Sequence, residues 1–145
     1  MAAAVGEPDE YAGELPVAFV TLKPGARADA ASIAAAIEPH IAERPAVPRR
    51  IDILESMPMT AIGKVYKPAL RARATQRALD ERLARAGLAG LVSVHVEDGA
   101  SGLVVRFNLT DRTADGTADA TLDERVRELM KPFALAYSVE RGGQL

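Results

Sequence analysis

Short apolar runs mark the strands in the first half of the chain. Residues 16–22 (PVAFVTL) are rich in β-branched side chains and stop at residues 23–25 (KPG), which predicts a strand buried on both faces. Residues 50–55 (RIDILE) alternate apolar and polar positions and predict another strand. Residues 2–6 are apolar and indicate the tail of a further strand, while residues 7–10 (EPDE) predict a turn.

An apolar stripe of helical period lies between these strands. Asp29 is a favourable N-cap, and the helix is predicted to run to about Glu43, with Pro39 kinking or ending it. The stripe consists of three isoleucines spaced four residues apart: Ile33, Ile37 and Ile41. Residues 44–48 (RPAVP) then break the pattern. Strand, helix and strand in this order predict a βαβ unit with a right-handed crossover.

A loop at residues 56–67 is followed by a long predicted helix. Pro68 suits a first helical turn, the helix should run to about Ala86, and Gly87 is its expected stop. Beyond Gly87 the apolar period changes to two. Residues 92–97 and 103–109 alternate around two glycine-containing turn signals, which predicts a β-hairpin.

The chain ends with a second predicted helix–strand pair. Residues 111–119 are polar and predict a loop, and residues 121–124 (TLDE) have a capping-box pattern. The helix that follows should end near Pro132, and its inward side chains are Leu122, Val126, Leu129 and Met130. The last strand is predicted at residues 134–140, with three side chains on one face: Leu135, Tyr137 and Val139.

This order of elements predicts an α+β fold in two lobes. Residues 1–87 form one lobe with a central sheet flanked by helices, and residues 88–145 form a β-β-α-β extension. The second lobe either continues the first sheet or forms a small subdomain, and both arrangements remain open. A stand-alone ferredoxin-like binding domain in the second lobe is a further alternative, and it requires residues 87–145 to fold alone.

Composition narrows the classes of function. The chain has 145 residues, 48% hydrophobic and 26% charged, with a formal net charge of -2, so a general affinity for nucleic acid or anionic membranes is not expected. The absence of Cys excludes disulfides and thiolate chemistry, and His40 and His95 are isolated, so no metal site is predicted. No apolar run approaches the ~20 residues of a membrane helix. These features predict a cytoplasmic protein without a membrane span.

The loop at residues 56–67 carries the candidate chemistry. Lys64 follows Gly63 directly, and a glycine lets a ligand approach the backbone while a lysine offers a compact charge on a flexible stem. A Walker A loop requires G-x-x-x-x-G-K-[ST]. Pro58 stands at its first glycine position and Val65 at its Ser/Thr position, so that motif is rejected.

The loop instead resembles the C-terminal lysine motif of the acyl-adenylate-forming superfamily, which includes the acyl-CoA synthetases. That pattern is roughly P-x-T-x-x-G-K-(I/V)-x-(R/K)-x-x-L-R, and eight positions match in register: Pro58, Thr60, Gly63, Lys64, Val65, Lys67, Leu70 and Arg71. Residues 5–20 also resemble the family's VG-x-PDE-x-x-GE-x-P-x-AFV stretch. The resemblance covers about residues 3–73. Residues 44–48 depart from it, because many members have Tyr-Lys-x-Pro there.

The resemblance implies a small C-terminal lid domain that moves over a larger N-terminal domain. The N-terminal domain would bind ATP, Mg²⁺ and a carboxylic acid, and CoA would then displace AMP from the acyl-adenylate. Lys64 would be the catalytic cation of adenylation, Thr60 and Gly63 would shape its loop, and Lys67 or Arg71 would meet phosphate or the partner domain.

The resemblance also implies that the chain is a fragment of a longer enzyme and is inactive alone. A fatty acid is the first expectation for the substrate, with aryl acids as an alternative. CoA is expected as acceptor rather than a carrier-protein pantetheine. A non-catalytic interaction or regulatory module that reuses this fold is the alternative from a different class.

Overall fold

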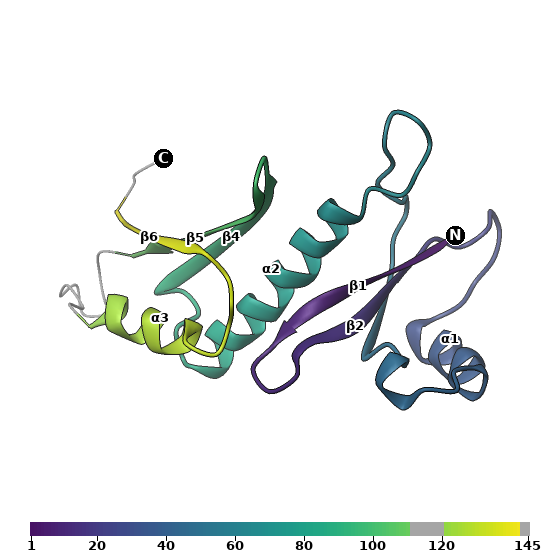
Figure 1. Cartoon of the computed structure of the whole chain (residues 1–145), viewed down its shortest axis with the longest axis horizontal. Helices are drawn as coiled ribbons and strands as arrows, with labels where there is room; N and C mark the ends of the chain where they lie inside the picture. The colour runs from purple at the N-terminus through teal and green to yellow at the C-terminus, as the bar shows by residue number, and fades with distance from the viewer. Residues whose placement is uncertain (111–120, 143–145) are drawn as a thin grey trace.

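The computed structural model describes residues 1–110 and 121–142, and these form an α+β fold with two separate three-stranded sheets (Figure 1). The first sheet contains β1 (Ala2–Asp9), β2 (Gly13–Val20) and β3 (Arg50–Ile53). The second contains β4 (Val92–Gly99), β5 (Gly102–Leu109) and β6 (Tyr137–Arg141). The helices are α1 (Ala30–Ile37), α2 (Lys67–Arg85) and α3 (Leu122–Met130), with two 3₁₀ turns at Glu38–His40 and Arg44–Ala46.

In the first sheet, β1 and β2 form an antiparallel hairpin and β3 lies parallel to β2. The parallel pair around α1 confirms the predicted strand–helix–strand unit. The predicted turn at residues 7–10 is wrong at its start, because Glu7, Pro8 and Asp9 continue β1 opposite residues 13–15. Pro8 is tolerated there because β1 is an edge strand, where a missing N–H need not break the sheet.

Helix α1 is shorter than predicted. It ends at Ile37 instead of continuing to Glu43, because Pro39 lies in the 3₁₀ turn that follows. Asp29 is the predicted N-cap, and its carboxylate accepts a hydrogen bond of 2.7 Å from the Ser32 amide. The Ser32 hydroxyl accepts in return from the Asp29 amide at 3.2 Å, which completes a capping box.

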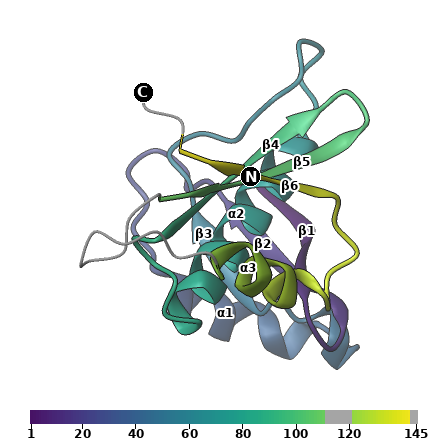
Figure 2. The same cartoon turned by 90° about the vertical axis from the view of Figure 1, so that its left-hand side faces the viewer.

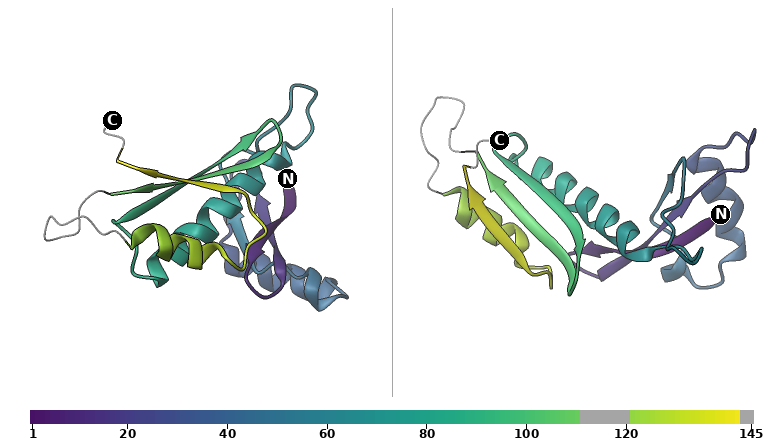
Figure 3. Two further views of the ribbon diagram at one scale, coloured as in Figure 1. Left: turned by 60° about the vertical axis from the view of Figure 1, so that its left-hand side comes forward. Right: turned by 90° about the horizontal axis from the view of Figure 1, so that it is seen from above.

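Helix α2 runs between the two sheets and contributes to both hydrophobic cores (Figure 3). Leu70 and Ala74 pack with β1 and β2, whereas Leu79 and Leu83 pack with β4, β5 and α3. The helix starts one residue before the predicted Pro68. Gly87, the predicted stop, has φ +68, a backbone conformation that favours glycine.

The second sheet repeats the strand order of the first, although no sequence repeat is apparent. β4 and β5 form the predicted hairpin, and β6 lies parallel to β5 after α3. The extension therefore forms a sheet of its own and does not continue the first sheet. All four predicted inward side chains of α3 are buried. The predicted loop at residues 111–119 lies outside the described residues.

Two details of the second lobe differ from the prediction. Thr121 precedes α3 with helical angles (φ -93, ψ -7) and its side chain makes no cap hydrogen bond, so the predicted capping box at 121–124 is wrong. β6 begins at Tyr137, three residues later than predicted. Leu135 and Val139 still pack on the core, and the Tyr137 ring meets Phe107 edge-on with centroids 5.8 Å apart.

Gln76 joins α2 to the outer edge of β4. Its side-chain amide donates to the Val94 carbonyl at 2.8 Å and accepts from the Val96 amide at 2.7 Å. These are the two backbone groups that a neighbouring strand would pair. The Gln76 carboxamide therefore occupies the free edge of the second sheet and holds the β4–β5 hairpin against the helix. Among the described residues, no helix is long and apolar enough to cross a membrane.

Candidate functional site

The segment that carries Lys64 folds as a tight turn between two short extended stretches. The Thr60 amide donates to the Lys64 carbonyl at 2.7 Å, and the Gly63 amide donates to the Thr60 carbonyl at 3.0 Å. The Thr60 hydroxyl accepts from the Lys64 amide at 3.1 Å. Gly63 has φ +78, so its conformation is one that other L-residues adopt at a cost. Thr60 and Gly63 thus both shape the turn around the lysine.

The base of this lysine loop (residues 58–66) is attached to the first core. Met59 and Val65 form an antiparallel bridge, and the Tyr66 amide donates to the Pro58 carbonyl at 2.8 Å. Val65 packs against the buried cluster that contains Phe19 and Leu70. The loop projects beyond the N-terminal end of α2, as Figure 1 shows. It therefore combines a fixed base with an exposed tip.

Lys64 itself is exposed and forms no ion pair with any described residue. Its ammonium group is thus available to an anion brought to the loop. A lysine in this state is a mobile point charge with three donors, which suits phosphate or carboxylate oxygens.

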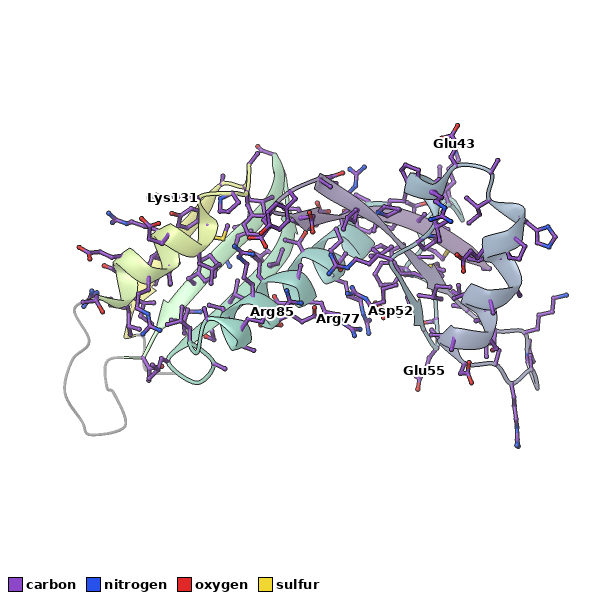
Figure 4. The ribbon with its side chains drawn as sticks, turned by 90° about the horizontal axis from the view of Figure 1, so that it is seen from below. Glu43, Asp52, Glu55, Arg77, Arg85 and Lys131 are labelled. Carbon is purple, nitrogen blue, oxygen red and sulfur yellow. The ribbon has the colours of Figure 1, made fainter. Side chains whose placement is uncertain are left out.

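The cations of α2 fall into two groups. Lys67 and Arg71, one helical turn apart and close to the lysine loop, are exposed and form no ion pair with another described residue. Further along the helix, Arg77 lies 2.9 Å from Asp52, and Arg82 lies 2.6 Å from Glu10. Figure 4 shows Arg77 beside Asp52 on this side of the helix. Within α2, the cations that form no ion pair with a described residue therefore lie in its first half, next to the lysine loop.

Two hollows in the described surface lie away from the tip of the lysine loop. A cavity of about 610 Å³ lies at the opposite end of α2, where Arg82, Arg85 and Leu88 face Leu129 of α3. A shallower hollow of about 430 Å³ is bordered by Arg71 together with Gly6, Glu14 and Pro45. Among the described residues, no three His, Asp or Glu side chains gather closely enough to hold a metal ion.

One contact at the loop was missed by sequence reasoning. The Tyr66 hydroxyl donates a hydrogen bond to the Asp98 carboxylate, which lies near the tip of the β4–β5 hairpin. This hydrogen bond raises the pKa of the Tyr66 phenol, because it stabilises the protonated form and the nearby negative charge opposes ionisation. In the sequence, the only signal that points to Tyr66 as a functional residue is its alternation with Lys64 around the apolar Val65.

Comparison with known proteins agrees with the motif. Residues 1–64 match the AMP-binding enzyme C-terminal domain family. The chain is 51% identical over 71 residues to marinolic acid–CoA ligase of Pseudoalteromonas sp., covering 49% of this chain and 11% of that protein. It is 37% identical over 71 residues to the long-chain-fatty-acid–CoA ligase of Bacillus subtilis, covering 49% of this chain and 12% of that protein.

A crystal structure of an acyl-CoA synthetase from Brucella canis matches 53% of this chain at 32% identity, with a TM-score of 0.47, and the match covers 15% of that protein. The chain thus spans about one-ninth of the length of the curated relatives named above. The family match includes the whole first sheet and ends at Lys64, within the lysine loop. Residues 1–64 are therefore similar to the AMP-binding enzyme C-terminal domain family, and the two curated relatives named above are CoA ligases.

Proposed function

We propose that this chain is the C-terminal lid domain of an ATP-dependent acyl-CoA synthetase and that Lys64 stabilises the adenylation transition state. The reaction would join a carboxylic acid to ATP, giving acyl-AMP and pyrophosphate, and would then transfer the acyl group to CoA with release of AMP. The observation that carries the proposal is the exposed ammonium of Lys64, which pairs with no described residue and lies on a shaped loop at the end of the family match.

The chemistry requires a cation at this point. A carboxylate oxygen attacks the α-phosphorus of ATP, so two anions approach each other while negative charge grows on the phosphoryl oxygens. An ammonium placed there reduces the repulsion and stabilises the transition state more than the ground state. Removing one such electrostatic group typically costs about 10²–10³ in rate.

The neighbouring residues have supporting roles in this proposal. Thr60 and Gly63 hold the turn through the hydrogen bonds around the Lys64 amide and carbonyl. Lys67 and Arg71, which pair with no carboxylate in the described part of the chain, extend the positive charge along the first turns of α2. They would contact phosphate oxygens or acidic side chains of the N-terminal adenylation domain.

ATP and Mg²⁺ would be bound mainly by that N-terminal adenylation domain. The part contributed here would be the lysine and its neighbouring cations. Alone, without the ATP and acid sites, the chain would not turn over substrate. A cytoplasmic location fits the use of ATP and CoA.

We propose a fatty acid as the substrate class, since one relative is named as a long-chain-fatty-acid–CoA ligase. Another relative, from Streptomyces carzinostaticus, is named for an aryl acid, 2-hydroxy-7-methoxy-5-methyl-1-naphthoate, so aryl acids remain the alternative. The acid pocket would lie in the adenylation domain.

The experiment is an assay of the full-length enzyme that carries this domain. Pyrophosphate release from ATP is measured with a panel of fatty and aryl acids, followed by thioester formation with CoA or with a phosphopantetheinyl carrier protein. The proposal predicts acid-dependent pyrophosphate release and acyl-CoA, and neither product from residues 1–145 alone. If no acid in the panel supports pyrophosphate release, the non-catalytic interaction module replaces the synthetase as the better account.

A further inference from the structure

The hydrogen bond from Tyr66 to Asp98 joins two segments that are 32 residues apart. Tyr66 ends the lysine loop and directly precedes α2, while Asp98 lies one residue before the end of β4. In Figure 2 the loop and the β4–β5 hairpin project toward the same side of the molecule. The contact therefore links the candidate active loop to the second lobe, which the family match does not reach.

Tyr66 is placed to influence the position of Lys64 through the short backbone segment that joins them. The stretch around Val65 is extended, since Val65 forms a β-bridge with Met59. Alternate side chains of an extended segment point to opposite faces. Val65 packs inward on the first core, so Lys64 and Tyr66 both lie on the outer face, two residues apart. A restraint on the Tyr66 ring is therefore a restraint on the backbone that presents the lysine.

The acceptor of this hydrogen bond belongs to a well-supported segment. Asp98 lies opposite Leu103 in the β4–β5 hairpin, and both strands contribute buried side chains to the second core. Gln76 fixes β4 to α2 through its two hydrogen bonds to the backbone of Val94 and Val96. The hairpin is thus a firm support beside the N-terminal end of α2.

We infer that Tyr66 and Asp98 are positioning residues for Lys64, and that residues 88–145 serve to brace the lysine loop for adenylation. This inference rests on the proposed function. It gives a role to residues 88–145, which the sequence motif of the lysine loop does not explain. The Tyr66 phenol remains protonated at neutral pH, so the donor is present under assay conditions.

The size of the expected effect follows from the exposure of the pair. Asp98 is exposed and the Tyr66 side chain is partly so, and water competes with their hydrogen bond. The effect on the loop is therefore partial, whereas a misplacement of about 1 Å at a reacting centre can cost up to about a hundredfold in rate. We expect Tyr66→Phe to slow adenylation by about three- to tenfold, less than the loss of Lys64 itself.

The first test uses the 145-residue chain alone and does not depend on catalysis. Amide hydrogen exchange is measured by NMR at Gly63 and Lys64 in the unaltered chain, in Tyr66→Phe and in Asp98→Ala. We expect both variants to speed exchange at these amides by about three- to tenfold. Tyr137→Phe, which alters a tyrosine of the same extension, is the control and should leave them unchanged. Equal exchange in all four proteins would overturn the inference.

The second test uses the full-length enzyme and separates the two half-reactions. Tyr66→Phe and Asp98→Ala should each lower kcat for pyrophosphate release by about three- to tenfold, with KM for ATP and thioester formation from premade acyl-AMP unchanged. The double variant should be no slower than either single variant, because both remove the same hydrogen bond. A merely structural defect would slow both half-reactions and raise KM as well.

The two proposals fail in different ways. If Lys64→Ala abolishes pyrophosphate release while Tyr66→Phe and Asp98→Ala react at the unaltered rate, the brace is refuted and the role of Lys64 stands. If Lys64→Ala has no effect, the proposed function of the loop falls, and the positioning role falls with it. In that case, altered exchange at Gly63 would still demonstrate the Tyr66–Asp98 contact, now as a structural contact only.

Discussion

Arg50 on β3 places its Nη2 atom 2.5 Å from the Oε2 atom of Glu7 on β1. Both side chains are largely shielded from water, at 17% and 6% exposed, and they connect the two outer strands of the first sheet across β2. A buried pair of this kind leaves an uncompensated charge when one partner is removed. The pair therefore constrains the sheet that supports the lysine loop.

We expect Arg50→Met to lower the free energy of unfolding by about 3 kcal/mol, since it leaves the Glu7 carboxylate buried without its cation. Urea denaturation followed by circular dichroism measures this change. The double variant Glu7→Leu with Arg50→Met should recover most of the loss, because no unpaired charge remains. An Arg50→Met chain as stable as the unaltered one would show that the pair contributes little.

The stability of the chain should depend on acidic pH through the β1–β2 turn. The amides of Ala12 and Tyr11 donate to Asp9 at 2.9 Å each and lower the pKa of its carboxyl group, and a hydrogen bond from Arg82 lowers the pKa of Glu10. Groups whose pKa is lower in the folded state stabilise the fold above their unfolded pKa of about 4. That contribution is lost as the pH falls through the folded pKa.

We therefore expect the urea midpoint to be nearly constant from pH 7 to about 5 and to fall below about pH 4. Asp9→Asn should reduce this acid dependence, because the amide cannot lose a stabilising charge. Glu55→Gln, which removes an exposed carboxylate labelled in Figure 4, should leave the urea midpoint at pH 7 unchanged and serves as the control for stability. Equal pH dependence in Asp9→Asn and the unaltered chain would refute this role of the turn.

The extension should not fold without α2. The core of the second lobe includes Leu79 and Leu83 of α2, and burying two leucines contributes about 3–6 kcal/mol, comparable with the whole stability of a small domain. We expect residues 88–145 alone to show no cooperative unfolding, whereas residues 67–145 should unfold cooperatively in urea. Cooperative unfolding of residues 88–145 would support a stand-alone binding domain and contradict the shared core.

Gly63 should tolerate only substitutions compatible with its backbone. Its φ of +78 is a left-handed conformation that asparagine adopts more easily than a β-branched residue. In the full-length enzyme, we expect Gly63→Val to slow pyrophosphate release by about tenfold or more and Gly63→Asn to slow it much less. Thioester formation from premade acyl-AMP should be retained by both. Equal rates for the two variants would mean that the turn geometry does not govern adenylation.

The periodicity of hydrophobic positions along the sequence predicted most of the fold. The strand at residues 50–53, the long helix before Gly87 and the β4–β5 hairpin lie where the pattern places them, because each buries one periodic face in its own core. Local turn signals were less reliable. The Glu7-Pro8-Asp9 stretch resembles a turn, but its position on a sheet edge and the ion pair with Arg50 stabilise it as a strand.

The candidate site, like the fold, could be predicted from the sequence only in part. The turn that Thr60 and Gly63 form around Lys64 could be predicted because it is local and is carried by a contiguous motif, whereas the catalytic role of Lys64 stays a prediction. The Tyr66–Asp98 hydrogen bond could not, because it depends on how α2 orients the second sheet relative to the lysine loop. That orientation is set by the shared core and by Gln76, which are tertiary contacts without a local pattern.

The measurement that tests the central claim most directly compares Lys64→Ala with the unaltered full-length enzyme in both half-reactions. Lys23→Ala, which alters another lysine after a strand of the first sheet, is the matched control. We predict that Lys64→Ala slows pyrophosphate release by about a hundredfold or more and largely preserves thioester formation from premade acyl-AMP, with Lys23→Ala unchanged in both. Equal pyrophosphate release in Lys64→Ala and the unaltered enzyme would contradict the assignment of Lys64 as the adenylation cation.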